Sequence, residues 1–325
     1  MIKLIITENQ GNQRLDRFLK KYFDKAPLSL IYRMIRKDIK LNGKRSREDV
    51  VLNAGDEITI YLTETEAANL RGAKEHVRAK RQFKIAYEDE NLLIVSKPYG
   101  LLTHGDRHEK KNHLANQVID YLIEKGDYDP VGDKTFTPSP ANRIDRNTTG
   151  LVIFAKDPQT LRELNALLRD KRGIEKYYLT IVNGRLSGEM TLRDQMVKDN
   201  ETNRAKIVGT ADGSKYMETI ARPLAYGKAG DRDYTLVEAQ ILTGRTHQIR
   251  VQLANVGHPL YGDYKYGIRA RDRSTQLLHS YKLVFTDEVA GKLAYMSGKV
   301  IIQEPPEDFT GIADRLFAGW RDTLR

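Results

Sequence analysis

Apolar positions in the first 62 residues follow strand and helix spacings in turn. Alternation predicts strands, and recurrence every three or four residues predicts helices. The expected elements are a strand at 2–6, helices at 15–22 and 28–35, a short strand at 39–41 and a strand at 56–62. The pair Asn42-Gly43 favours a hairpin turn after residue 41. We therefore expect a small α+β module over residues 1–62.

Residues 63–82 are polar and highly charged without an apolar period, so we expect a linker there. From residue 83 to 325, strand and helix signals alternate. A buried strand is expected at 92–95, and further strands are expected around 178–182 and 237–242. One helix is expected over 114–122, ended by Gly126, and another starting at Asp157-Pro158. Many strands with few helices predict an α+β domain with a mixed, largely antiparallel sheet.

The charge balance points to an anionic partner. The chain has 325 residues with 54 Lys and Arg against 44 Asp and Glu, a net charge of +10. Nucleic acid is the commonest anionic partner of a soluble basic protein, although a basic surface that only aids solubility is the alternative. The excess is concentrated on the second helix and the hairpin of the first module, where the candidate RNA-binding residues are Arg33, Arg36, Lys37, Lys40, Lys44 and Arg45.

Several classes of protein are disfavoured by composition. The chain has no Cys, which removes disulfides, thiol nucleophiles and the usual structural zinc sites. Its seven His are dispersed without metal-ligand spacing, so no metal site is expected. The start has no long apolar segment and no apolar run approaches membrane-spanning length. A soluble, cytoplasmic protein is the expectation.

The most informative stretch is Asn142-Arg143-Ile144-Asp145-Arg146-Asn147-Thr148-Thr149-Gly150, which precedes an apolar run of strand length. It places one carboxylate between two guanidiniums in a polar turn. A neighbouring Arg favours the ionised carboxylate, and an ionised Asp can act as a nucleophile or a base. Taken alone, such an Asp is more often the cap of a turn with a weak surface ion pair.

Two later stretches favour a catalytic role for Asp145 over a turn cap. In Gly244-Arg245-Thr246-His247-Gln248-Ile249-Arg250, Thr246 can cap a helix with Ile249 and Leu253 on its apolar face. Arg250 would then lie one turn into the helix and could reach a carboxylate on a neighbouring element. Alternation also places Tyr178 on the strand face opposite Tyr177, where its ring could stack on a base or pack in the core.

Taken in this order, the three stretches resemble the catalytic signature of the RluA family of RNA pseudouridine synthases. Arg143-Ile144-Asp145-Arg146 with Thr148-Thr149-Gly150 resembles the aspartate motif, although Asn142 replaces the usual His. The Tyr178 stretch resembles the tyrosine motif and residues 244–250 the arginine motif. The stretch 257–263 and Leu278-His279 also fit the family, so the similarity extends over about residues 85–310.

The resemblance implies the pseudouridine synthase fold and isomerisation of uridine to pseudouridine in RNA without a cofactor. Asp145, Tyr178 and Arg250 would be the catalytic residues, with Arg250 paired to Asp145 and Tyr178 against the flipped-out base. Asp145 could attack C1′, remove a C2′ proton or add to the base. Beside these motifs, Arg143, Arg146, Arg245 and His247 are expected to contact RNA.

The first module resembles the alpha-L RNA-binding domain of a small-subunit ribosomal protein, through residues 13–19, 31–37 and 41–45. This domain order is similar to the RluC-like branch, which implies large-subunit ribosomal RNA as the substrate and a monomeric enzyme. Two alternatives stay open at this point. One is a non-catalytic RNA-binding or ribosome-assembly factor, and the other is a nucleoside or base glycosidase.

Overall fold

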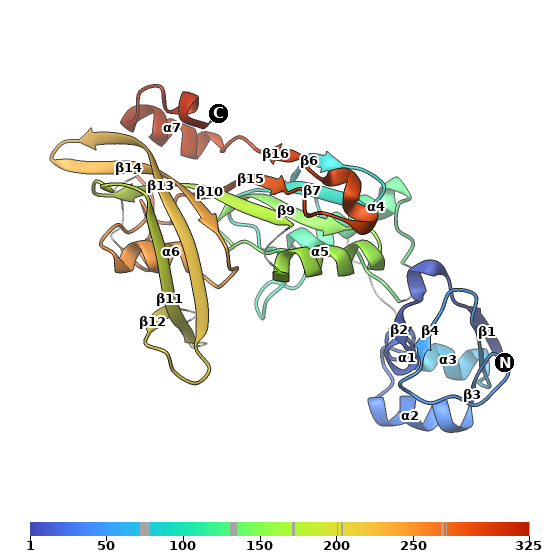
Figure 1. The fold of residues 1–325 in the computed structure, drawn as a ribbon. Helices are drawn as coiled ribbons and strands as arrows, with labels where there is room; N and C mark the ends of the chain where they lie inside the picture. Colours follow the sequence, from blue (N-terminus) through green and yellow to red (C-terminus); the bar gives the residue numbers. More distant parts are fainter. Residues whose placement is uncertain are drawn as a thin grey trace.

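The first module is a three-stranded antiparallel sheet packed on helices (Figure 1). The computed structural model describes residues 1–325 except 72–78, 131–134, 171–172, 200, 203, 268–269, 271 and 325. In this module the sheet order is β1-β5-β3, and a separate pair joins β2 to β4. Its elements are β1 (Ile2–Ile5), the 3-10 helix η1 (Glu8–Gln10), β2 (Gln13–Arg14), α1 (Leu15–Tyr22), α2 (Leu28–Lys37), β3 (Ile39–Leu41), β4 (Val51–Leu52), β5 (Glu57–Ile60) and α3 (Glu64–Leu70).

The expected strands and helices of this module are confirmed, with two differences. The turn Asn42-Gly43 is present with both residues at positive φ, but beyond the single bridge between Leu41 and Lys44 no hairpin ladder follows. Strand β3 instead pairs with β5. Helix α3 lies within the expected linker, where Thr63 and Glu66 form a capping box. Ala67 is buried in the core of the module and Leu70 packs against it. Two apolar contacts in a short, mostly polar segment were too few to show a helical period.

The large domain is built on one mixed sheet, with strand order β12-β11-β13-β14-β10-β15-β9-β7-β6. Strand β16 pairs with β15, and β8 pairs with β9. Among the described strands, β15 and β9 run parallel and the other neighbours are antiparallel. The strands are β6 (Lys84–Glu88), β7 (Leu92–Lys97), β8 (Ser139–Pro140), β9 (Thr149–Ala155), β10 (Ile174–Asn183), β11 (Met190–Asp199), β12 (Arg204–Val208), β13 (Lys215–Ala229), β14 (Arg232–Ile241), β15 (Leu278–Phe285) and β16 (Val300–Ile302). The expected α+β class with a largely antiparallel sheet is confirmed.

Helices cover both faces of the central strands (Figure 1). They are α4 (Leu114–Lys125), α5 (Pro158–Asp170), α6 (Gln248–Asn255) and α7 (Glu307–Leu316), with 3-10 helices η2 (Gly291–Met296) and η3 (Trp320–Leu324). Along β9, Val152 and Phe154 pack in one cluster with α4, and Leu151 and Ile153 pack in another with α5. Burial on both faces explains why β9 is a continuous apolar run and not an alternating one.

The parallel contact between β9 and β15 depends on Gly150. This residue has φ +106°, and a Cβ there would lie 2.1 Å from the carbonyl oxygen of Ser280. Only glycine fits both the dihedral and the close approach of the two backbones. The glycine of the aspartate stretch therefore sets the distance between the two strands, just after the loop that carries Asp145.

The expected helix signals are also confirmed in the large domain. Asp157 Oδ1 accepts hydrogen bonds from the backbone N–H groups of Gln159 and Thr160 and so caps α5. Helix α4 ends at Gly126, which has φ +84°. Among the helices that the structure describes, none is long and apolar enough to cross a membrane.

Candidate active site

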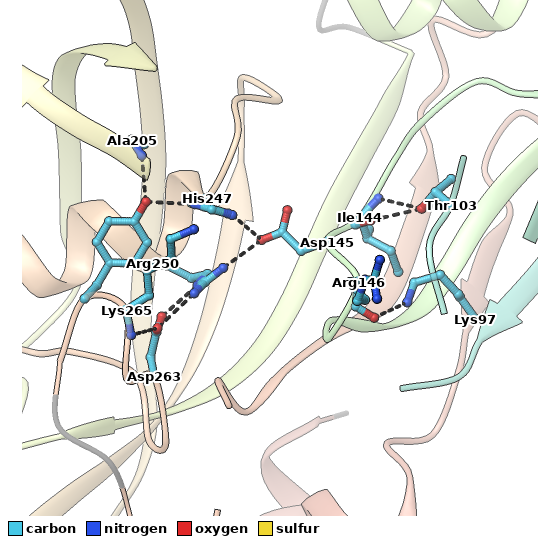
Figure 2. A network of polar contacts seen from close by, with 11 residues as sticks. Lys97, Thr103, Ile144, Asp145, Arg146, Ala205, His247, Arg250, Asp263 and Lys265 are labelled. Atoms are coloured by element: carbon cyan, nitrogen blue, oxygen red, sulfur yellow. Dashed lines mark hydrogen bonds and ion pairs between the residues drawn. The ribbon is translucent and has the colours of Figure 1, made fainter. Parts of the chain in front are cut away.

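The loop that carries Asp145 lies between β8 and β9 and is held at its backbone on both sides of that residue (Figure 2). The Thr103 hydroxyl donates to the carbonyl oxygen of Ile144 at 2.9 Å and accepts from its N–H at 3.3 Å. On the other side, Lys97 Nζ donates to the carbonyl oxygen of Arg146 at 2.9 Å. The position of the Asp145 side chain is therefore fixed from both directions.

Lys97 is a fully buried lysine that joins three backbone carbonyls. Its ammonium also donates to the carbonyl oxygens of Pro98 and Leu101, at 3.0 and 2.7 Å. Burial lowers its pKa to about 7, although the charge of Asp145 opposes this shift. Lys97 thus fastens the end of β7 to the Asp145 loop. Lys97 was not among the site residues expected from the sequence.

Arg250 lies between two carboxylates, as the residues on the left of Figure 2 show. Its Nη1 is 3.2 Å from Asp145 Oδ2, which confirms that the two side chains pair. Nε and Nη2 bind the two oxygens of Asp263 at 2.7 and 2.9 Å. Burial alone would lower the pKa of Arg250, but the hydrogen bonds to Asp263 and the two negative charges raise it. A permanent cation therefore faces Asp145 in a fixed orientation.

Asp263 was not predicted as part of the site. It is completely buried, and its Oδ1 also accepts the N–H of Lys265 at 3.0 Å. The sequence placed Asp263 at the end of the 257–263 stretch without a role. A buried carboxylate needs a charged partner, but the sequence does not show that this partner is Arg250, 13 positions earlier.

His247 is held against Tyr266. The hydroxyl of Tyr266 accepts the N–H of Ala205 at 2.7 Å and forms a 2.7 Å hydrogen bond with His247 Nδ1. This contact fixes the orientation of the ring, with Nε2 on the side of Asp145. This Nε2 lies 3.7 Å from Asp145 Oδ2. Burial and the charge of Arg250 lower the pKa of His247 to about 4, although Asp145 opposes the shift.

Replacing His247 with glutamine is expected to make stability less sensitive to acid. An unfolded His titrates near pH 6.5, so between about pH 4 and 6.5 the unfolded chain binds a proton that the folded protein excludes. The free energy of unfolding therefore falls as the pH drops through this window. His247→Gln should reduce that slope by up to about 1.4 kcal/mol per pH unit. Urea unfolding at several pH values measures it, and an unchanged slope would contradict a neutral buried His247.

The start of α6 differs from the expected Thr246 cap. The helix begins at Gln248, and His247 occupies the N-cap position with φ 54°, ψ 21°. The Gln248 side chain ties the preceding loop together, since its Oε1 accepts from the Thr243 hydroxyl at 2.7 Å and from the Arg245 N–H at 3.1 Å. Arg250 still lies in the first turn, as expected.

Tyr178 and Tyr177 point to opposite faces of β10, as alternation predicts. Tyr178 is 5% exposed and borders the pocket, whereas the Tyr177 hydroxyl donates to Glu175 on the other face. Burial, and to a smaller degree the charge of Asp145, raise the pKa of Tyr178 to about 12. The Tyr178 hydroxyl is therefore protonated at neutral pH.

An open pocket of about 590 Å³ brings the three predicted catalytic residues together. It is lined by Asp145 and its neighbours, by Tyr178 and Ile241, by residues 244–250 and by Leu278. Asp145 is the one carboxylate among these lining residues. Its side chain is 24% exposed, and no hydrogen bond from the described residues reaches its Oδ1. One carboxylate oxygen is thus held by Arg250 and the other is free to act.

The predicted RNA contacts of the large domain lie in different surroundings. Arg143 is exposed at the pocket rim, and Arg245 is exposed with its Nε donating to the carbonyl oxygen of Tyr216. Arg146 points away toward Asp106, with which it forms an exposed ion pair at 3.2 Å. His247, as described, is buried against Tyr266. The contacts of these four residues with RNA stay predictions.

The six basic residues of the first module form a separate, exposed group on α2, β3 and the turn after it. Lys40 is half-buried, with its ammonium 5.4 Å from the centre of the Tyr61 ring, and the others are exposed. No ion pair to a described residue neutralises any of Arg33, Arg36, Lys37, Lys40, Lys44 and Arg45. Their charge is available to an anionic partner.

Asn142 has a structural role here. Its Oδ1 accepts the N–H of Ile153 at 2.8 Å, and its Nδ2 lies 3.5 Å from the carbonyl oxygen of Leu151. The side chain therefore continues the edge of β9 toward the Asp145 loop. A group of three or more His, Cys, Asp or Glu able to hold a metal is absent from the described residues.

Comparisons with known proteins agree with this geometry. A family model described as RNA pseudouridylate synthase matches residues 91–255. The chain is 34% identical over 277 residues to ribosomal large subunit pseudouridine synthase C of Vibrio cholerae, covering 83% of this chain and 82% of the relative. The enzyme of the same description from Escherichia coli is 30% identical over 314 residues, covering 90% and 91%.

Two further matches are a relative that covers most of the chain and a solved structure with a similar fold. An uncharacterized RNA pseudouridine synthase of Mycoplasma capricolum is 30% identical over 311 residues, covering 94% of this chain and 98% of the relative. The solved structure of human RNA pseudouridylate synthase domain containing 4 superposes with a TM-score of 0.53 at 22% identity, over 71% of this chain and 93% of that one. This structure shows a shared fold.

Proposed function

Because the chain belongs to the RNA pseudouridylate synthase family, we propose that it isomerises uridine to pseudouridine in large-subunit ribosomal RNA, with Asp145 as the reacting carboxylate. The relatives at 30–34% identity that are named as large-subunit enzymes support this substrate. The observation that carries the role of Asp145 is its free Oδ1 in the pocket beside Arg250. The non-catalytic alternative is disfavoured, since a factor that only binds RNA does not need this pair.

The reaction breaks the bond from N1 of uracil to C1′ and forms a bond from C5 to C1′. Asp145 must be ionised whether it attacks C1′, removes the C2′ proton or adds to the base. Attack at C1′ would form a glycosyl ester like that of a retaining glycosidase, which needs a second carboxylate as the acid. Asp145 is the single carboxylate among the described residues that line the pocket. That suits a leaving group that carries its own charge as a delocalised uracil anion.

Arg250 and His247 position Asp145 in this scheme. Arg250 holds Oδ2 and favours the ionised form, so that Oδ1 is presented to the substrate. The Nε2 of His247 lies 3.7 Å from the same Oδ2. Both residues therefore lie on the Oδ2 side of the carboxylate. Asp263 fixes the guanidinium from behind.

Tyr178 is assigned to the flipped base. Its ring borders the pocket beside Asp145, where it can stack on the extruded uracil. Its hydroxyl, which burial keeps protonated, can relay the C5 proton by accepting it on its oxygen while its own proton passes to water in the open pocket.

Tyr178→Phe is expected to reduce turnover by about 100-fold while RNA affinity is kept, because stacking survives and the relay is lost. Single-turnover pseudouridine formation and RNA binding measure the two effects. Tyr177→Phe, on the opposite face, serves as the control and should retain turnover. Unchanged turnover in Tyr178→Phe would leave Tyr178 with packing alone.

The proposed function is tested by incubating the purified protein with transcribed large-subunit ribosomal RNA and mapping pseudouridines. Formation of pseudouridine at defined positions is expected without added metal or cofactor. Release of free uracil would instead reveal a glycosidase. Binding of the RNA without product would indicate a non-catalytic factor. If the protein modified only RNA other than large-subunit ribosomal RNA, the proposed substrate would be wrong.

The first module is proposed to hold the RNA while the large domain acts on it. The exposed cations on α2 and the turn after β3 provide phosphate contacts, which should weaken with salt. We place the enzyme in the cytoplasm as a monomer. The first module was expected over residues 1–62 and is extended here by α3 to Leu70, and the large domain is proposed from residue 83. Crosslinking of bound RNA to peptides from residues 33–45 tests the assigned surface.

A further inference from the structure

A second groove adjoins the active-site pocket. It has a volume of about 1040 Å³ and shares lining residues with the pocket, among them Arg143, Tyr178 and Arg245. From there it runs along β10 to the end of α5, at Arg169. The described residues that line it include several cations and neither Asp nor Glu. The groove is therefore suited to a negatively charged ligand.

Lys176 is the unusual residue in this groove. It lies on β10 between Ile174 and Tyr178, and alternation puts all three side chains on one side of the strand. Ile174 packs in the cluster with α5, and Tyr178 borders the pocket. Lys176 lies between them and is only 9% exposed. An apolar side chain at this position would pack without the cost of burying a charge.

No described residue forms a hydrogen bond or an ion pair with Lys176. The other buried lysines among the described residues do have partners. Lys97 donates to three backbone carbonyls, and Lys156 pairs with two carboxylates. Burial lowers the pKa of Lys176 to about 8, and no carboxylate in the described part of the chain counters the shift. Burying an unpaired cation is costly, so a position that keeps one points to a ligand that supplies the missing charge.

We propose that Lys176 binds a backbone phosphate of the RNA strand next to the flipped uridine, and that the groove holds that strand. The inference rests on the proposed function. Residues two apart on a strand are about 7 Å apart, which puts the ammonium within one nucleotide of a base stacked on Tyr178. Arg143 and Arg245 lie at the junction of pocket and groove, where the same strand would pass.

Lys176 differs from the surface cations in its exposure and in its lack of a partner among the described residues. Arg169, at the far end, is exposed and already pairs with Asp170 at 3.1 Å. Lys176 is 9% exposed and has no partner among the described residues, so its attraction to phosphate is less screened than that of a fully exposed charge. It would therefore favour RNA whose backbone follows the groove, and so help to select the geometry around the target uridine.

The test compares Lys176→Met with Lys176→Arg and with Lys299→Met, an exposed lysine outside both cavities that removes the same charge. Each protein is assayed for kcat/KM on the transcribed ribosomal RNA over a range of salt. Lys176→Met is expected to lose about 10-fold or more in kcat/KM, mainly through KM. The slope of log affinity against log salt should fall by about 0.7, the value for one contact to a single strand. Lys176→Arg should keep most activity, and Lys299→Met should resemble wild type.

RNA binding is also measured in an Asp145→Ala background, where turnover plays no part. A weaker affinity of the Asp145→Ala/Lys176→Met protein supports the inference even if the reaction proves to be another. Wild-type affinity with an unchanged salt slope would overturn it, whatever the wild-type enzyme does to uridine. A wild-type protein that binds RNA but forms no pseudouridine would overturn the proposed function and leave this binding result standing.

A purely structural Lys176 is separated by stability and by labelling. If the lysine served packing, Lys176→Met would lower the melting temperature and leave the salt slope unchanged. The inference expects an equal or higher melting temperature, because an unpaired buried charge is removed. In the Asp145→Ala protein, RNA should also protect Lys176 from an amine-acylating reagent. Full labelling in the presence of saturating RNA would contradict the contact even if the methionine variant fails to fold.

Discussion

Replacing Asp145 with alanine is expected to abolish pseudouridine formation, by at least about 1,000-fold, while RNA affinity stays the same or increases. Asp145 is the carboxylate that the pocket presents, and its Oδ1 has no partner among the described residues. No neighbouring side chain can replace it. Affinity is preserved because removing a negative charge from a basic surface does not oppose RNA binding.

Asp145→Asn sharpens this result, because it retains the shape and removes the charge. It should be as inactive as the alanine variant if the ionised oxygen reacts. The control is Asp287→Ala, an exposed aspartate away from the pocket, which should behave as wild type. Single-turnover assays and filter binding on the same RNA measure activity and affinity. Normal product formation by Asp145→Ala would refute the assigned site.

The second large effect is expected at Arg250. Arg250→Met should reduce activity by about 100-fold or more, since Asp145 loses the donor that orients it. The same change leaves Asp263 fully buried without its partner, and breaking a buried pair in this way costs about 3–5 kcal/mol of stability. The variant should therefore be both inactive and easier to unfold in urea.

A double variant separates these two losses. In Arg250→Met/Asp263→Leu the buried charge is removed together with its partner, and apolar side chains of similar size fill the space. Such replacements are often neutral for stability, so most of the lost free energy of unfolding should return. Activity should not return, because the contact to Asp145 is still absent. Recovery of activity together with stability would show that Arg250 only supports the fold.

The sequence predicted more of the secondary structure than of the contacts that form the site. Strand β9, helix α4 and helix α5 follow from local patterns, because their apolar residues and caps lie within one element. The meeting of Asp145 with Arg250 could be inferred from motif order, and the structure confirms it. These features depend on residue types that are informative by themselves.

The rest depends on contacts that no local pattern contains. Asp263, Tyr266 and Thr103 act through partners far away in the chain, so their roles appear only once the fold has placed them. The cap of α6 was assigned to Thr246 by residue preference, but the side chain of Gln248 ties the turn instead. Helix α3 was missed because only Ala67 and the partly buried Leu70 contact the core, and the residues around them are mostly polar.

The sheet order has a consequence for how the enzyme is made. Strand β15 lies between β9 and β10, although it follows both in the chain. The loop before β9 carries Asp145, and β10 carries Tyr178, so these residues belong to separate halves of the sheet until β15 joins them. A nascent chain that has reached Asp263 already contains every proposed catalytic group. It has no active site, because the strand that brings the halves together has not yet been synthesised.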